Sequence, residues 1–292
     1  MVSIFVSIAS YRDPDLVNTV RSAYENAKHP HLLFFSIFSQ APDDEHADLS
    51  FIPEKNIRYV KVSHEESKGA CWAREIASRD IVGSYFLQVD SHSRFRMHWD
   101  TMVIAAYKRS QAFYGNRIFL THYPDPFQLS EDGSDRLMPM EGHYKLNAFW
   151  HEGSKMIQGQ WADTVDTQHG DEQYFMSANC LFTEADYMRE VPYDSELYFT
   201  GEEPSLAIRA YTRGFRLISP NVKFMYTNFK RERPLHWNDH SEWWELNQKS
   251  YKRLERIMKG EDLGIYGIGS KFLYEQYQKI TGIDLQSKDY AI

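Results

Sequence analysis

The chain has few cysteines, no excess of basic residues and no long apolar run. Its 292 residues include two cysteines, Cys71 and Cys180, which excludes a disulfide framework and favours reduced thiols. The formal net charge is −8 and no block of Lys or Arg occurs, so neither nucleic acid nor an anionic membrane is an expected partner. No apolar run approaches the roughly 20 residues of a transmembrane segment, and residues 1–10 lack the basic leader of a signal peptide. We therefore expect a cytoplasmic protein.

Several common catalytic motifs are also missing. The sequence contains no Cys-x-x-Cys pair, no Walker loop, no Gly-x-Gly-x-x-Gly and no Gly-x-Ser-x-Gly. Cys71 lies within an apolar helical pattern, which is more typical of a packing residue than of a nucleophile. Aromatic residues, by contrast, are abundant at 15%. Such a content suits a sugar-binding cleft and equally suits a large core.

The first ninety residues alternate between strand-like and helix-like segments. Strands are predicted for four apolar runs, at residues 4–8, 33–38, 57–62 and 85–89, and the first is typical of a buried parallel strand. Asp13 can cap a helix with Pro14 in its first turn, and residues 69–78 predict a second helix. This order predicts an α/β fold with a mostly parallel central sheet flanked by helices, and ligands at the carboxyl ends of its strands.

The rest of the chain is less regular. The polar stretch 151–173 predicts a long loop, and Trp161 within it favours a lid or an acceptor-contacting loop over disorder. Further elements are predicted by pattern: a strand at 174–182, a helix at 204–213 that ends at Gly214, and helices at 241–258 and 272–280. We expect one domain over residues 1–240 and a C-terminal helical extension, 241–292, packed on it.

The sharpest local feature is an apolar strand that ends in Asp90-Ser91-His92. Alternate residues of an extended chain share a face, so a carboxylate and an imidazole would point the same way. These two ligands suit Mn²⁺, and a cation held there can bridge phosphate oxygens. The same tripeptide also fits a turn capped by Asp90 and followed by a surface histidine.

Two helix starts carry further candidates. Gly69 opens one helix with free backbone N–H groups, and Lys68 and Arg74 add positive charge, as in an anion site. Glu202 and Glu203 open another helix after Gly201 and could bind sugar or acceptor hydroxyls. Both starts also fit plain structural roles, since acidic residues are favoured by the dipole at a helix N-terminus.

Taken in order, several long blocks resemble one known family. They are IFVSIASYR, DPDLVNTVRSAYENAKHP, KGACWARE, FLQVDSHSRF, VPYDSELYFTGEEPSLAIRAYTRGFRLISP and the tail LGIYGIGS…GIDL. Over nearly the whole chain the sequence resembles glycosyltransferase family 60, the hydroxyproline-polypeptide N-acetylglucosaminyltransferases. The Asp-Ser-His also resembles the metal motif of the polypeptide N-acetylgalactosaminyltransferases, which have the same fold type.

The resemblance implies a GT-A fold, a UDP-sugar donor (UDP-GlcNAc by family), a Mn²⁺ or Mg²⁺ cofactor and retention of anomeric configuration. By position, it implies that Ser10, Tyr11 and Arg12 lie near the uridine and that Arg74 contacts the nucleotide. Asp90 and His92 would bind the metal, and Ser177, Ala178 and Asn179 would form part of the sugar floor. Glu202 and Glu203 would contact the transferred sugar or the acceptor.

One departure from the family concerns the third metal ligand. The family tends to have a Tyr-His pair on the strand after the Gly-Glu-Glu helix, whereas residues 224–229 contain no histidine. We expect His236 to substitute, with His240, Asn228 or a thinner protein shell as the alternatives.

The sequence therefore predicts a metal-dependent, retaining glycosyltransferase that moves a sugar from a UDP-sugar to a hydroxyl of a protein or glycan. Lys68, Arg74 and the N–H groups near Gly69 would stabilise the leaving diphosphate, with Ser91 beside it, and Trp161 would exclude water. Two alternatives are a nucleotide-sugar hydrolase and a non-catalytic module that binds UDP or a glycan. Transfer could proceed by attack on the leaving-group face or by double displacement through Glu202.

Overall fold

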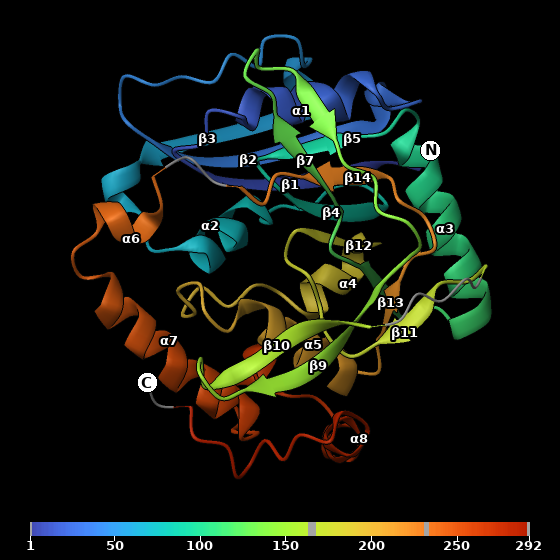
Figure 1. Ribbon diagram of the computed structural model, residues 1–292, viewed down its shortest axis with the longest axis vertical. Coiled ribbons are helices and arrows are strands. Elements are labelled where there is room, and N and C mark those ends of the chain that lie inside the picture. The colour runs from blue at the N-terminus through green and yellow to red at the C-terminus, as the bar shows by residue number, and fades with distance from the viewer. Residues whose placement is uncertain (1, 163–167, 231–233, 291–292) are drawn as a thin grey trace.

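The computed structural model describes residues 2–162, 168–230 and 234–290 (Figure 1). Eight strands form its central sheet: β1 (Ile4–Tyr11), β2 (Leu33–Ala41), β3 (Ile57–Ser63), β4 (Tyr85–Asp90), β6 (Ile118–Thr121), β11 (Asp171–Gln173), β12 (Cys180–Glu184) and β13 (Arg216–Ser219). Their order is β11-β13-β6-β12-β4-β1-β2-β3. Four of the seven pairings are parallel, and β12 runs antiparallel to both of its neighbours. The predicted α/β fold with a mostly parallel sheet is confirmed.

Two smaller sheets complete the β structure. One contains β5 (Ser93–Phe95), β14 (Met225–Thr227), β7 (Asp125–Leu129) and β8 (Asp135–Leu137), in that order. The other is a hairpin of β9 (Lys145–His151) and β10 (Met156–Ala162). The prediction of a loop over 151–173 is therefore wrong for β10 and for residues 171–173, because Met156 and Ile157 are buried and the polar residues that follow them belong to a paired strand; residues 163–167 lie outside the described residues. The strand predicted at 174–182 is shorter and starts only at Cys180.

The helices cover both faces of the central sheet (Figure 1). Their bounds are α1 (Leu16–Glu25), α2 (Ala70–Ala77), α3 (Trp99–Tyr114), α4 (Ala185–Glu190), α5 (Glu202–Thr212), α6 (His236–Asp239), α7 (Trp243–Met258) and α8 (Lys271–Thr281). None of the helices within the described residues has the length and apolar character needed to cross a membrane.

Strand β1 shows how alternation builds two cores. Ile4, Val6 and Ile8 belong to the cluster that also contains buried residues of α1 and α3. Phe5 points to the opposite face, into a cluster with residues of α4 and α5. Because successive side chains of a strand point to opposite faces, a fully apolar run is buried on both sides, as expected for a parallel strand under two helical layers.

The strand order places a ligand-binding edge between β1 and β4. From β1 the chain proceeds to β2 and β3 on one side, and then returns to β4 on the other side. Adjacent parallel strands whose connections leave in opposite directions open a crevice at their carboxyl ends. The ends of β1 and β4, at Tyr11 and Asp90, form that crevice.

The C-terminal helices share a core with the rest of the chain. Tyr251, Leu254, Ile257 and Met258 of α7 are buried in one cluster with Phe175 and with residues of α5 and the β9–β10 hairpin. Helix α8 contributes Tyr274 and Tyr277 to the same cluster. Figure 1 shows the hairpin on the side of the molecule away from α1, next to α5.

Candidate active site

The carboxyl end of β4 brings Asp90 beside the end of β1, where Ala9 pairs with it in register. The Asp90 side chain is buried, and three groups surround it. Arg74 Nη2 lies 2.7 Å from Oδ1, while Asn179 Nδ2 and His92 Nε2 lie 2.6 Å and 3.4 Å from Oδ2. Asp90 is thus the point where β4, α2 and the segment before β12 meet.

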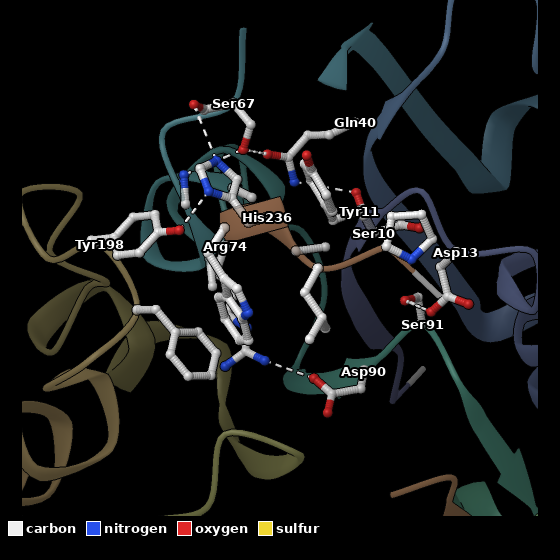
Figure 2. Close-up of a pocket in the computed structure, with 18 of the residues that line it drawn as sticks. Ser10, Tyr11, Asp13, Gln40, Ser67, Arg74, Asp90, Ser91, Tyr198 and His236 are labelled. Atoms are coloured by element: carbon white, nitrogen blue, oxygen red, sulfur yellow. Dashed lines mark hydrogen bonds and ion pairs between the residues drawn. The ribbon is translucent and has the colours of Figure 1, made fainter. Parts of the chain in front are cut away.

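His92 is held between two carboxyl groups. Its Nδ1 lies 3.0 Å from Asp13 Oδ2, and its Nε2 faces Asp90. Ser91 also donates its hydroxyl to Asp13 (Figure 2). A carboxylate on one ring nitrogen fixes the ring and directs the other nitrogen toward a ligand. Asp13 therefore orients His92; it is not the expected helix cap, since α1 begins at Leu16 after Asp15.

Asp90 and His92 fit a divalent cation as two adjacent ligands. One carboxylate oxygen and one imidazole nitrogen suit Mn²⁺, and their separation of 3.4 Å is short enough for one cation to contact both. Asp13 supplies the outer carboxylate that histidine ligands usually have. Among the described residues, no group of three or more His, Cys, Asp or Glu side chains could hold a metal, so other ligands would come from the substrate or water.

His236, the expected third ligand, lines the same cavity as Asp90 and His92, but its ring nitrogens have other partners. Its Nδ1 lies 2.5 Å from the Tyr198 hydroxyl, its Nε2 lies 3.3 Å from the Ser67 carbonyl, and its ring stacks on His240 at 3.9 Å. Both ring nitrogens of His236 thus already have protein partners. The alternatives are also engaged elsewhere: His240 Nε2 lies 2.9 Å from the His64 carbonyl, and Asn228 Oδ1 accepts the Lys230 N–H.

Arg74 links the metal pair to the start of α5. Its guanidinium donates to Asp90 and to Glu202, and both ion pairs are buried. Burial alone lowers the pKa of this guanidinium, but Glu202 and Asp90 raise it overall, so Arg74 stays charged. Burial raises the pKa of Glu202, while Arg74 opposes that rise. Arg74 thus supplies positive charge next to Asp90.

Glu203 occupies a different setting from its neighbour. Its Oε1 accepts the Ala178 N–H at 2.8 Å, and the Tyr123 hydroxyl lies 3.5 Å from its Oε2. Burial raises the pKa of this carboxyl from 4.5 to about 7, although the Ala178 N–H lowers it. Paired carboxyl groups with different pKa values can serve different roles in one site.

Two cavities meet at these residues. The first, of about 110 Å³, is lined by the ends of β1 and β2, by α2 and by residues 234–237. The second, of about 390 Å³, is lined by the Glu202-Glu203 helix start, Asn179, Tyr123 and the β10 strand. Arg74, Asp90 and Phe199 line both. A ligand in two parts could therefore lie across the junction, with its bridging group beside Arg74 and Asp90.

The first cavity has a neutral polar end away from Asp90. Ser10 lines it, and Gln40 donates to the Ser10 carbonyl at 3.2 Å and accepts from the Ser67 hydroxyl (Figure 2). Tyr11, expected near a nucleotide, also lines this cavity, and its hydroxyl and the Arg12 guanidinium bind Asp239 of α6, each at 2.7 Å. Arg12 thus fixes α6 beside the cavity, and its own side chain does not line the cavity.

The start of α2, where Lys68 and Gly69 suggest an anion site, has N–H groups that bind within the protein. The Gly69 N–H donates to the Ser67 hydroxyl at 3.3 Å, and the Cys71 N–H meets the Tyr198 carbonyl at 3.5 Å. Lys68 is exposed and lies 5.6 Å from the Trp72 ring centroid. Gly69 and Tyr198 both line the first cavity, and two N–H groups of this helix start already have protein acceptors.

Trp161 lies beside the second cavity. Its side chain is 40% exposed and contacts Tyr144 edge-on, with 4.9 Å between ring centroids. The Tyr123 ring, which lines the cavity, is 6.0 Å away. Trp161 is thus placed to contact a ligand that protrudes from the cavity.

Sequence reasoning missed four residues of the site: Asp13 as a partner of His92, Gln40, Tyr123 and Tyr198. Gln40 and Tyr123 lie at the carboxyl ends of β2 and β6, so the strand-end rule that identified Asp90 could have found both. Asp13 and Tyr198 come from connections whose path no local pattern predicts.

Comparison with known proteins bears on this geometry. A family model described as Glycosyltransferase (GlcNAc) matches residues 3–51 and 41–286. The chain belongs to this glycosyltransferase family. A sequence comparison with curated proteins finds no match. The family assignment therefore rests on the family model.

Solved structures share the fold. GalNAc-T7, solved with UDP, GalNAc and Mn²⁺, is similar with a TM-score of 0.63 and 15% identity over 97% of this chain. S. aureus TarS residues 1–349, solved with UDP-GlcNAc, gives 0.51 and 14% over 90%. The chain spans 55% of the GalNAc-T7 chain and 68% of that TarS chain. The fold of this glycosyltransferase is thus the GT-A fold.

Proposed function

We propose that the chain transfers a sugar, with GlcNAc as the preferred one, from a UDP-sugar to a hydroxyl acceptor. The transfer retains the anomeric configuration and uses Mn²⁺ or Mg²⁺. The junction of the two cavities at Arg74 and Asp90 carries this proposal. A nucleotide in the first cavity and a sugar in the second would place the diphosphate at that junction. The family description and the resemblance to glycosyltransferase family 60 support GlcNAc as the sugar.

The residues at the junction suit a departing diphosphate. Asp90 and His92 would hold the cation, and a bound cation supplies charge neutralisation to the leaving phosphate. Arg74 adds a buried positive charge that is already oriented by Glu202, so little reorganisation is needed as charge develops. Gln40 and Ser10 would face the base, whose neutral edges need hydrogen-bond partners rather than charge.

The transfer step breaks the bond between the sugar C1 and the phosphate oxygen and forms one between C1 and the acceptor oxygen. On the leaving-group face, the departing phosphate oxygen takes the acceptor proton, so UDP and a glycoside are the products. We favour this face over double displacement because Arg74 binds one carboxylate oxygen of Glu202, which makes Glu202 a weaker nucleophile. Glu203 would instead hold a hydroxyl of the sugar or the acceptor.

The test is UDP release from a panel of UDP-sugars by the wild type and Asp90→Ala, with Mn²⁺ and with EDTA. We expect release from UDP-GlcNAc that needs the metal and falls at least 100-fold in the variant. Asp262→Asn, an exposed control, should match the wild type. Equal turnover by Asp90→Ala in EDTA would overturn the proposal, and UDP binding without turnover would indicate a binding module instead.

A further inference from the structure

We propose that the outer part of the second cavity binds a saccharide as the acceptor, with Trp161 as the surface on which a pyranose ring stacks. This inference rests on the proposed function, because it assigns the acceptor half of the same site. It narrows the acceptor from any hydroxyl to one carried by a sugar.

A continuous series of contacts leads from the junction to Trp161. Asp90 binds Asn179, and the neighbouring Ala178 N–H binds Glu203. Glu203 lies against the Tyr123 hydroxyl, and the Tyr123 ring faces Trp161. A ligand that extends outward from the reacting carbon would meet Glu203 first and the two aromatic rings next.

The hairpin positions Trp161 on the wall of the cavity. Residues of alternating number on β10 share a face, so Trp161 continues the row formed by Ile157 and Gly159, both of which line the cavity. A Cβ at Gly159 would lie 2.5 Å from the Phe175 ring, so only glycine fits there. The Tyr251 hydroxyl fixes the hairpin to α7 by a 2.9 Å bond to the Ser154 carbonyl.

Trp161 places an exposed indole at the end of a row whose other members, Ile157 and Gly159, are buried and half-buried. The hairpin faces solvent here with Trp161 rather than with a polar residue, and Tyr144 braces the ring edge-on at 4.9 Å. The C–H face of a pyranose is flat and apolar and packs on such a ring, while its hydroxyls need polar partners nearby. Gln158 and Ser154 line the same cavity and supply neutral polar groups.

The charges of the cavity disfavour an acidic acceptor. Among the described residues that line it, Arg74 is the one cation, and it is bound to Asp90 and Glu202. Glu203 adds a third carboxyl group. A phosphate- or carboxylate-bearing acceptor would therefore meet repulsion, whereas a neutral sugar would meet hydrogen-bond partners.

The experiment compares acceptors in the presence of UDP-GlcNAc and Mn²⁺. One panel holds methyl glycosides of GlcNAc, GalNAc, galactose, glucose and mannose; the other holds peptides with serine, threonine or hydroxyproline. The enzymes are the wild type, Trp161→Ala, Trp161→Phe and the control Trp244→Ala, whose indole is exposed on α7. Transfer to the acceptor and UDP release without acceptor are measured separately.

We expect transfer to at least one glycoside, a KM for it raised tenfold or more in Trp161→Ala, and partial recovery in Trp161→Phe. Trp244→Ala should match the wild type both in transfer and in acceptor-free UDP release. Transfer to peptides alone, or a glycoside KM unchanged in Trp161→Ala, would overturn the assignment while leaving the donor half intact. Absence of all UDP release by the wild type would overturn the proposed function and this assignment with it.

Discussion

The orientation of the His92 ring depends on a carboxyl group that is far from it in sequence. Asp13 lies 3.0 Å from its Nδ1 and also accepts from Ser91 (Figure 2). Outer carboxylates of this kind keep a histidine ligand in one tautomer and one orientation, and their loss typically costs 10- to 100-fold in metal affinity. We therefore expect the site to require Asp13 as well as the Asp-Ser-His motif.

Asp13→Asn should weaken Mn²⁺ binding about 10-fold or more, because the amide keeps the shape of the side chain but loses its charge. The measurement is Mn²⁺ titration by electron paramagnetic resonance in the presence of UDP. Asp43→Asn, on an exposed loop, is the control. An unchanged Mn²⁺ affinity in Asp13→Asn would show that His92 needs no such partner.

Glu203 should make stability depend on pH. Its folded pKa of about 7 lies above the ordinary 4.5, so its contribution is fully present below pH 4.5 and is lost as the pH rises through 7. The free energy of unfolding of the wild type, relative to Glu203→Gln, should fall by about 3 kcal/mol between pH 4.5 and 8. Urea unfolding of both proteins at each pH measures this, and a difference independent of pH would contradict the shifted pKa.

At the scale of elements, the first ninety residues were predictable because each strand is rich in β-branched and aromatic residues and lies between polar turns. Strands β1 to β4 and helices α1 and α2 lie where the pattern predicts them. The β9–β10 hairpin was not predicted, since its exposed face is polar and its buried face contains Gly159, which gives no hydrophobic signal. The role of α6 was also hidden, because its contacts with Tyr11 and Arg12 join residues more than 200 positions apart.

The turn before α2 offers a test at this scale. Gly69 has φ +101°, and a Cβ there would lie 2.4 Å from the Tyr198 carbonyl oxygen. Gly214 has φ +82° but no atom within 4 Å of its Cβ position. Gly214→Ala should cost about 1 kcal/mol from backbone strain, and Gly69→Ala about 3 kcal/mol or more. Equal losses in urea unfolding would mean that Tyr198 moves aside without cost.

Across the whole molecule, the site depends on the C-terminal helices. Leu254 of α7 is buried and packs against Gly201, the N-cap of α5. A Cβ on Gly201 would lie 3.1 Å from the Leu254 side chain. Helix α5 begins with Glu202 and Glu203. We propose that residues 241–292 form part of one folding unit with the rest of the chain. Periodicity predicted these helices but could not show which surface they cover.

Leu254→Ala should therefore destabilise the whole protein by about 2–5 kcal/mol in a single cooperative transition. Phe272→Ala, whose side chain is 72% exposed on α8, should change the stability by less than about 0.5 kcal/mol. Urea unfolding followed by tryptophan fluorescence and by circular dichroism gives both values. Separate transitions for the two signals would show that α7 unfolds independently.

The central claim is that a nucleotide sugar spans the two cavities with its diphosphate at Asp90 and His92. A crystal structure with UDP-GlcNAc and Mn²⁺, recorded with anomalous scattering from manganese, tests this directly. We expect the manganese peak between Asp90 Oδ2 and His92 Nε2, UDP in the cavity lined by Gln40, and GlcNAc beside Asn179 and Glu203. A peak elsewhere, or UDP bound with no manganese at this pair, would contradict the account.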